Sequence, residues 1–168
     1  MNPLPPPLGD GGIRHWRLDD ARHAATWTSG EGSFRVGGRW NARGTRAVYT
    51  ALDPATAILE VAVHKTFEAL DTIPHVLTSA LVLDPKRLFI VKPDELPNPH
   101  WLHPGQPSAG QQAFGSRLLA EHGAFLAPSV VSHHSWNLIF EASAAAWLFS
   151  GIVQERFSLD PRLSPPIQ

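Results

Sequence analysis

Residues 30–49 combine glycine, arginine and aromatic residues unusually densely. The glycines let the backbone turn sharply and approach a ligand closely, and the forked arginine side chain matches phosphate oxygens. Trp40 and Tyr49 offer flat faces on which a ring could stack. Together these types favour a nucleotide-like ligand, although a glycine-rich turn with solvated arginines fits the same pattern and no GxGxxG or Walker-type loop is present. The four arginines are Arg35, Arg39, Arg43 and Arg46.

Glu60 and His64 lie four residues apart in a segment of helical periodicity and therefore share one helix face. Because Leu59 and Val61 flank it, the Glu60 carboxylate is expected to be partly buried, and a buried carboxylate needs a partner or a chemical role. An exposed Glu–His pair at the edge of a buried stripe is the structural alternative.

Ser129 follows Pro128 in the apolar run AFLAPSVV, and no GxSxG elbow surrounds it, which argues against a serine hydrolase. Its hydroxyl is expected to bond either to backbone or to a ligand phosphate or sugar. Two histidine pairs raise the question of metal, but one lies in a proline-rich loop and neighbours on a strand point to opposite faces. We therefore expect no metal site. The pairs are His100 with His103 and His133 with His134.

Short apolar runs and turn residues predict the elements that position these side chains. Strands are expected over 13–18, 47–51, 76–83, 88–91, 124–131, 136–140 and 153–159. Helices are expected from the N-cap Asp53 to about 70, over 111–122 before Gly123, and over 142–150. The stripe expected to be buried on the first helix is Ile58, Leu59, Ala62, Val63 and Phe67. Irregular alternation of these elements predicts an α+β fold, a single domain with a mixed or antiparallel central sheet and flanking helices.

Length and composition fit one domain over 13–163, preceded by a flexible proline- and glycine-rich arm over 1–12 and followed by a loose tail over 164–168. A net charge of −1 gives no general attraction to nucleic acid or membrane, so an anion site would be local. The absence of cysteine excludes disulfides, thiolate ligands and a cysteine nucleophile. With neither a signal-like start nor a membrane-length apolar run, a cytoplasmic protein is expected.

Several motifs, in order, resemble the RES domain family, the toxin component of bacterial Xre–RES toxin–antitoxin pairs. They are HWRL, GGRWN followed by VY, an E-x-x-x-H helix, FLAPSVV and RFSLDPRL, spread over about 15–163. The resemblance implies a fold similar to the ADP-ribosyltransferase toxins, with NAD bound in a cleft of the central sheet. It also implies cleavage of the nicotinamide–ribose bond of NAD, with water or inorganic phosphate as acceptor.

The family's residues carry over to matching positions. Arg17, Arg39, Glu60 and Ser129 would be catalytic, and Arg17, Arg39, Tyr49 and Ser129 would bind substrate. NAD would be the substrate, with no separate cofactor. Since nicotinamide leaves as a neutral molecule, the reaction needs no general acid but needs a grip on the pyrophosphate and negative charge near the ribose cation. The arginines suit the first task and Glu60 the second.

The family resemblance also implies an Xre-type helix-turn-helix antitoxin as partner and a homodimer within the complex, while free toxin would deplete NAD and arrest growth. One segment departs from the family: Asn137 and Leu138 are kept, but Phe140 and Glu141 stand where Asn-Pro is usual. Two alternatives therefore stay open, an ADP-ribosyltransferase acting on a protein and a non-catalytic relative acting through its antitoxin complex.

Overall fold

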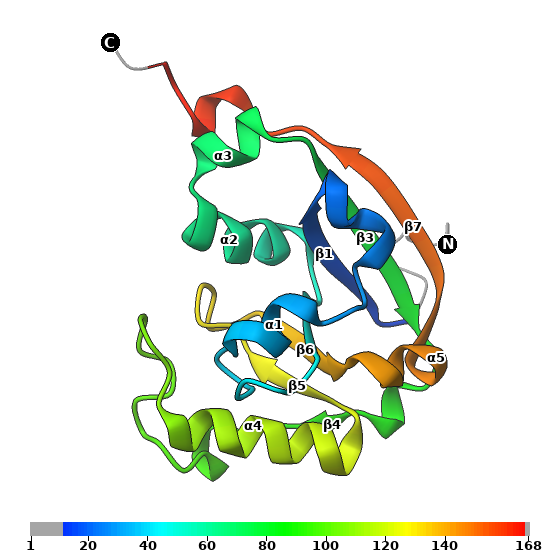
Figure 1. The fold of residues 1–168 in the computed structure, drawn as a ribbon, viewed down its shortest axis with the longest axis vertical. Coiled ribbons are helices and arrows are strands. Elements are labelled where there is room, and N and C mark those ends of the chain that lie inside the picture. The colour runs from blue at the N-terminus through cyan, green and yellow to red at the C-terminus, as the bar shows by residue number, and fades with distance from the viewer. Residues whose placement is uncertain (1–11, 167–168) are drawn as a thin grey trace, which may run out of the picture.

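A seven-stranded mixed sheet runs through the centre of the computed structural model, which describes residues 12–166 (Figure 1). Its spatial order is β4-β5-β6-β2-β1-β3-β7, and neighbouring strands are antiparallel except for the parallel pair β4–β5. The strands are β1 (Arg14–Asp20), β2 (Ala47–Ala51), β3 (His75–Val82), β4 (Phe89–Ile90), β5 (Ala124–Pro128), β6 (Trp136–Glu141) and β7 (Phe149–Phe157). The predicted class, a single α+β domain built on a mixed sheet, is confirmed.

The sheet opens between β1 and β2. Strand β1 pairs with β3 along its whole length, but with β2 only at Trp16 opposite Ala51. Beyond that pair, the Arg17 guanidinium donates to the Tyr49 backbone carbonyl at 2.8 Å, where a ladder hydrogen bond would otherwise form. A charged side chain thus occupies the gap between two strands at the centre of the sheet.

The helices are α1 (Glu31–Val36), α2 (Pro54–Lys65), α3 (Phe67–Thr72), α4 (Ala109–His122) and α5 (Ala145–Leu148), with a six-residue 3₁₀ helix, η1 (Ala21–Thr26), after β1. In Figure 1, α4 lies beside β4 and β5, whereas α2 and α3 lie at the other end of the molecule near β1. Helix α4 ends as predicted at Gly123, whose φ of 75° suits glycine. Among residues 12–166, no helix is long and apolar enough to cross a bilayer.

The helix predicted to run from Asp53 to about residue 70 is divided in two, which corrects that expectation. Thr66 adopts a φ of 75°, its N–H closes α2 on the Ala62 carbonyl, and its side chain caps α3 by accepting from the Ala69 N–H. The N-terminus was predicted correctly, with the Asp53 side chain accepting from the Thr56 N–H at 2.8 Å.

The predicted buried stripe on this helix was wrong at two positions. Leu59 and Val63 are 38% and 61% exposed, whereas the apolar side that packs inward contains Ile58, Val61 and Ala62. The helix is apolar around much of its circumference, so periodicity alone did not identify the buried face. The face that carries Glu60 consequently turns toward the open part of the sheet.

Other boundaries differ from the sequence prediction. Strand β5 stops at Pro128, which leaves Ser129 in the following loop, and β7 begins at Phe149 inside the predicted last helix. Helix α1 was not predicted, because its glycine-containing sequence matches a turn as well as a helix. Residues 1–11 of the predicted arm and 167–168 of the predicted tail lie outside the described residues.

Three groups of buried side chains hold these elements together. One contains Trp27, Phe140 and Phe149, and another contains Leu18, Leu70, Leu77 and Leu159. The third surrounds Trp40, whose ring lies 5.9 Å from that of Trp101 and 5.8 Å from that of Phe125. Phe140, one of the departures from the family pattern, is thus a fully buried core residue.

Candidate functional site

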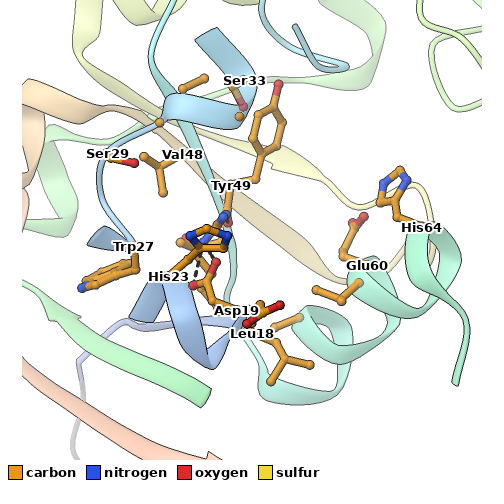
Figure 2. Close-up of a pocket in the computed structure, with 18 of the residues that line it drawn as sticks. Leu18, Asp19, His23, Trp27, Ser29, Ser33, Val48, Tyr49, Glu60 and His64 are labelled. Atoms are coloured by element: carbon orange, nitrogen blue, oxygen red, sulfur yellow. Dashed lines mark hydrogen bonds and ion pairs between the residues drawn. The ribbon is translucent and has the colours of Figure 1, made fainter. Parts of the chain in front are cut away.

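A cavity of about 840 Å³ lies where β1 and β2 separate. Its walls come from β1, η1, α1, β2 and α2 (Figure 2), so residues between Trp16 and Lys65 enclose it, with one contribution from β6. Of the residues singled out in the sequence, Arg17, Arg35, Tyr49, Glu60 and His64 line it. Figure 2 shows Glu60 and His64 projecting from the same side of α2. The volume is in the range of ordinary small-molecule sites.

Arg17 is fixed within the cavity wall by β1 and β2. Its Nε donates to both carboxylate oxygens of Asp19, at 2.9 and 3.0 Å, and its Nη1 donates to the Tyr49 carbonyl. Burial raises the pKa of Asp19, and the adjacent guanidinium opposes that rise. Within residues 12–166 the Arg17 Nη2 makes no hydrogen bond, so its N–H groups are available to an anion.

Tyr49 is held through its hydroxyl. The phenol donates to Asn41 Oδ1 at 2.7 Å and accepts from the Trp40 N–H at 2.9 Å. Burial raises the pKa of this phenol, which keeps it protonated as the donor. With the hydroxyl committed, the part of Tyr49 that remains for a ligand is its ring.

Glu60 meets two side chains from distant parts of the sequence. Its Oε1 accepts from Ser129 Oγ at 2.9 Å and from Asn137 Nδ2 at 2.8 Å, whereas Oε2 has no hydrogen-bond partner among residues 12–166. The side chain is half-buried at the cavity wall. The expectation of a partly buried carboxylate with partners is confirmed, and the exposed Glu–His pair is not observed.

Ser129 lies behind Glu60 and does not line the cavity. It is fully buried, its hydroxyl hydrogen is directed at Glu60, and its Oγ accepts from the backbone N–H groups of Val131 and Ser132. In this arrangement Ser129 does not reach the cavity, and its single hydroxyl hydrogen is already donated to the Glu60 carboxylate. Direct contact of Ser129 with a substrate stays a prediction.

Arg39 also lies outside the cavity lining. Its Nη1 donates to the Trp101 carbonyl at 3.0 Å and its Nη2 to the Gly105 carbonyl at 3.4 Å. Partial burial lowers the pKa of Arg39, and the charge of Glu60 opposes that shift. Arg39 therefore contributes positive potential near Glu60, while its observed contacts hold the loop over 98–105.

The predicted stacking platform at Trp40 is wrong. Trp40 is 1% exposed and packs in the core, and Asn41 has no exposed surface. Asn41 instead binds its own loop, with Nδ2 donating to the carbonyls of Ser33, Ala42 and Thr45 at 3.0–3.3 Å. Trp40 and Asn41 of the GGRWN motif are thus buried supports for Tyr49, and neither residue lines the cavity.

Two polar residues that bond to Arg17 and Glu60 were not predicted from the sequence. Asp19 could have been found, because it is two residues after Arg17 on one strand and so shares its face. Asn137 could not be placed at Glu60 from the sequence, since 77 residues separate them. No group of three or more His, Asp or Glu side chains in the described part of the chain could hold a metal ion.

Comparison with known proteins gives three findings. Residues 14–160 match the family described as "RES domain". Two curated proteins named "Toxin Res" are similar: one from Yersinia enterocolitica is 27% identical over 83% of this chain and 91% of its own, and one from Pseudomonas putida is 32% identical over 88% and 97%. A chain in the crystal structure of the M. tuberculosis MbcT–MbcA toxin–antitoxin complex has a similar fold, with a TM-score of 0.66 and 22% identity over 86% of this chain and 84% of that one.

Proposed function

This chain belongs to the RES domain family, and from that premise we propose that it is the toxin of a bacterial toxin–antitoxin pair and cleaves the nicotinamide–ribose bond of NAD. One observation carries the proposal: the Glu60 carboxylate and the Arg17 guanidinium line the same cavity, at the opening of the sheet. A substrate that carries a pyrophosphate and develops positive charge on a ribose matches a cavity that offers both a guanidinium and a carboxylate.

In the proposed reaction the bond between ribose C1′ and the nicotinamide nitrogen breaks, and its electron pair neutralises the pyridinium ring. Neutral nicotinamide leaves, and the ribose passes through an oxocarbenium-like state. A water or phosphate oxygen then bonds to C1′, and with water one proton is released to solvent. Atoms and charge balance without an added acid or cofactor.

Glu60 would supply the negative charge that the ribose cation requires. Its Oε2 has no hydrogen-bond partner among the described residues, so it would face C1′ or the 2′-hydroxyl while Oε1 stays bound to Ser129 and Asn137. Arg17 would orient the pyrophosphate through its Nη2 group. The Tyr49 ring would pack against the nicotinamide or the ribose. Arg39 would influence the substrate through the electrostatic potential of its charge, as long as its guanidinium stays bound to the loop.

The test uses purified full-length protein incubated with NAD, with nicotinamide and the ribose product separated by chromatography. We expect one nicotinamide for each NAD consumed, with free ADP-ribose in phosphate-free buffer. A phosphorylated product that appears only with inorganic phosphate would identify phosphorolysis. Radiolabelled NAD added to a bacterial lysate distinguishes the transferase alternative, which would label protein. Absence of nicotinamide release under all three conditions would contradict the proposal.

We also propose an antitoxin partner of the Xre type. This rests on the family, on two relatives named as toxins and on a structural neighbour solved within a toxin–antitoxin complex. Induction of this chain alone should stop bacterial growth and lower cellular NAD, and co-expression of the product of the adjacent gene should restore both. Growth arrest that persists in Glu60→Gln would separate toxicity from NAD cleavage.

A further inference from the structure

Asn137 lies at a fixed point of the sheet beside Glu60. It belongs to β6, and its backbone is paired with Ala51 on β2 and with Ala127 on β5. The side chain is 8% exposed and lines the cavity. Because strands on both sides hold its backbone, this residue offers a more rigid support than a loop residue could.

The orientation of the Asn137 amide follows from its partner. An ionised carboxylate only accepts hydrogen bonds, so the amide nitrogen faces Glu60 Oε1, 2.8 Å away. The amide oxygen then lies on the other side, buried and without a hydrogen-bond partner in the described part of the chain. The side chain therefore makes one hydrogen bond, to Glu60, and leaves its acceptor unsatisfied.

An unsatisfied buried acceptor destabilises a fold, and a leucine, whose side chain has the same branching, would avoid that cost. Packing therefore does not explain an asparagine here. What it supplies is a second donor to the same carboxylate oxygen that Ser129 Oγ approaches at 2.9 Å. Two donors on Oε1 fix the rotation of the carboxylate and leave Oε2 toward the cavity.

We infer that Asn137 is a positioning residue, which together with Ser129 forms a two-donor clamp on Glu60 Oε1 and so aims Oε2 at the substrate. The inference rests on the proposed function for its kinetic consequence, and on geometry alone for the clamp. This inference gives a role to the segment WNLIF, in which Asn137 is the first residue that matches the family pattern. The hydroxyl of Ser129 then acts as a second support of the Glu60 carboxylate.

The primary test measures nicotinamide release by the full chain carrying Asn137→Leu, with kcat and KM determined separately. We expect kcat to fall about 10- to 100-fold, the effect of losing a hydrogen bond to a charged group. KM should stay within about twofold of the wild-type value, because Asn137 does not bind the substrate. The melting temperature should equal or exceed that of the wild type, since the unsatisfied acceptor is gone. A wild-type kcat in a folded Asn137→Leu protein would overturn the inference.

A second variant, Asn137→Asp, keeps the shape but replaces the donor by a second carboxylate. At pH 8 its activity should be below that of Asn137→Leu, because two anions face each other. It should recover as the pH falls, because a proton shared by the pair restores a donor. A pH profile parallel to that of the wild type would overturn the clamp even if Asn137→Leu failed to fold.

Thr50→Val is the matched control. Thr50 is buried and lines the same cavity, but its hydroxyl donates to the Leu138 carbonyl at 2.9 Å and contacts His15, not Glu60. This variant should keep the wild-type pH profile. A recovery at low pH like that of Asn137→Asp would assign the effect to general loosening of the sheet and contradict the clamp.

One readout does not need activity. The side-chain NH₂ resonances of Asn137, followed by NMR in ¹⁵N-labelled protein, should move in Glu60→Ala and stay in place in Thr50→Val. If the wild type releases no nicotinamide, the proposed function fails while this shift would still support the clamp. Unmoved resonances in Glu60→Ala would overturn the clamp whatever the enzyme assay gives.

Discussion

The wall of the cavity and the glycine-rich segment 37–46 use similar residue types in opposite ways. In the wall, Arg17 is fixed by Asp19 and by the Tyr49 carbonyl, and its Nη2 makes no hydrogen bond within residues 12–166. In the glycine-rich segment, the Arg39 guanidinium donates hydrogen bonds to the carbonyls of Trp101 and Gly105. Two arginines that look equivalent in sequence thus differ in place, because Arg17 lines the cavity and Arg39 does not.

The aromatic residues differ in the same way. The Tyr49 ring borders the cavity, whereas Trp40 is buried beneath it and contributes its backbone N–H to the Tyr49 hydroxyl. The lesson is that a dense motif can consist of a few ligand-facing groups and a larger number of residues that support them. The predictions below test this division.

The largest effect is expected at Glu60. Glu60→Gln keeps volume and can still accept from Ser129 and Asn137, but it removes the charge that would stabilise the ribose cation. We expect nicotinamide release to fall about 100- to 1,000-fold, the range for loss of one preorganised electrostatic group. The melting temperature should change little. Turnover near the wild-type rate would remove Glu60 from the proposed mechanism.

The two arginines should then respond differently to the same substitution. Arg17→Lys loses the forked contact within the cavity, so kcat/KM for NAD should fall about 100-fold, because a point charge does not replace a guanidinium. Arg39→Lys should cost about tenfold and should lower the melting temperature, since its carbonyl contacts hold the loop. Steady-state kinetics and thermal melting of both variants provide the check, and a reversed order would mean that Arg39 is the residue that grips the substrate.

His15 represents a third environment, two residues before Arg17 on β1 but buried against Trp27 and Phe149. Burial, aided by Arg14, lowers the pKa of His15 to about 4. An unfolded histidine titrates near 6.5, so between pH 6.5 and 4 the unfolded chain binds more protons and stability falls with falling pH. His15 therefore contributes about 3 kcal/mol to the free energy of unfolding above pH 6.5, and this contribution is lost as the pH falls to about 4.

Urea unfolding at pH 7.5 and 4.5 measures this contribution. The wild type should lose more stability on acidification than His15→Phe, which has no titrating group at that position. Equal losses in the two proteins would show that His15 is not a source of acid sensitivity.

The smallest effect concerns the support of the glycine-rich segment by α4. A Cβ at Gly115 would lie 2.0 Å from the Trp40 carbonyl oxygen, whereas one at Gly110 on the same helix meets only Ser108 Oγ at 4.0 Å. Gly115→Ala should reduce the free energy of unfolding by about 1–3 kcal/mol. Gly110→Ala should be neutral or stabilising by up to about 1 kcal/mol. Denaturant titrations of the pair test whether close packing on Trp40 is required.

The sequence predicted local structure well wherever one signal dominated. Asp53 and Pro54 identified the start of α2, Gly123 the end of α4, and the apolar runs the central strands. Prediction failed where conformation depends on contacts with distant segments. The residues around Thr66 do not indicate that it adopts a positive φ, and the helical periodicity does not indicate that Leu59 and Val63 remain exposed.

The site was predictable by resemblance but not by geometry. The residue types Arg17, Tyr49, Glu60 and Ser129 could be named from motifs, yet the sequence does not reveal which of them reach the cavity. Ser129 and Glu60 are 69 residues apart, and their contact depends on the order of strands in the sheet. Sequence periodicity describes faces within one element and carries no information on which faces meet.

A crystal structure of Glu60→Gln soaked with intact NAD would show directly whether the cavity binds this substrate. We expect NAD in the cavity between β1 and β2, with ribose C1′ next to the side chain of residue 60 and the pyrophosphate within hydrogen-bonding distance of Arg17. NAD bound on another surface, or an unoccupied cavity at saturating NAD, would contradict this expectation.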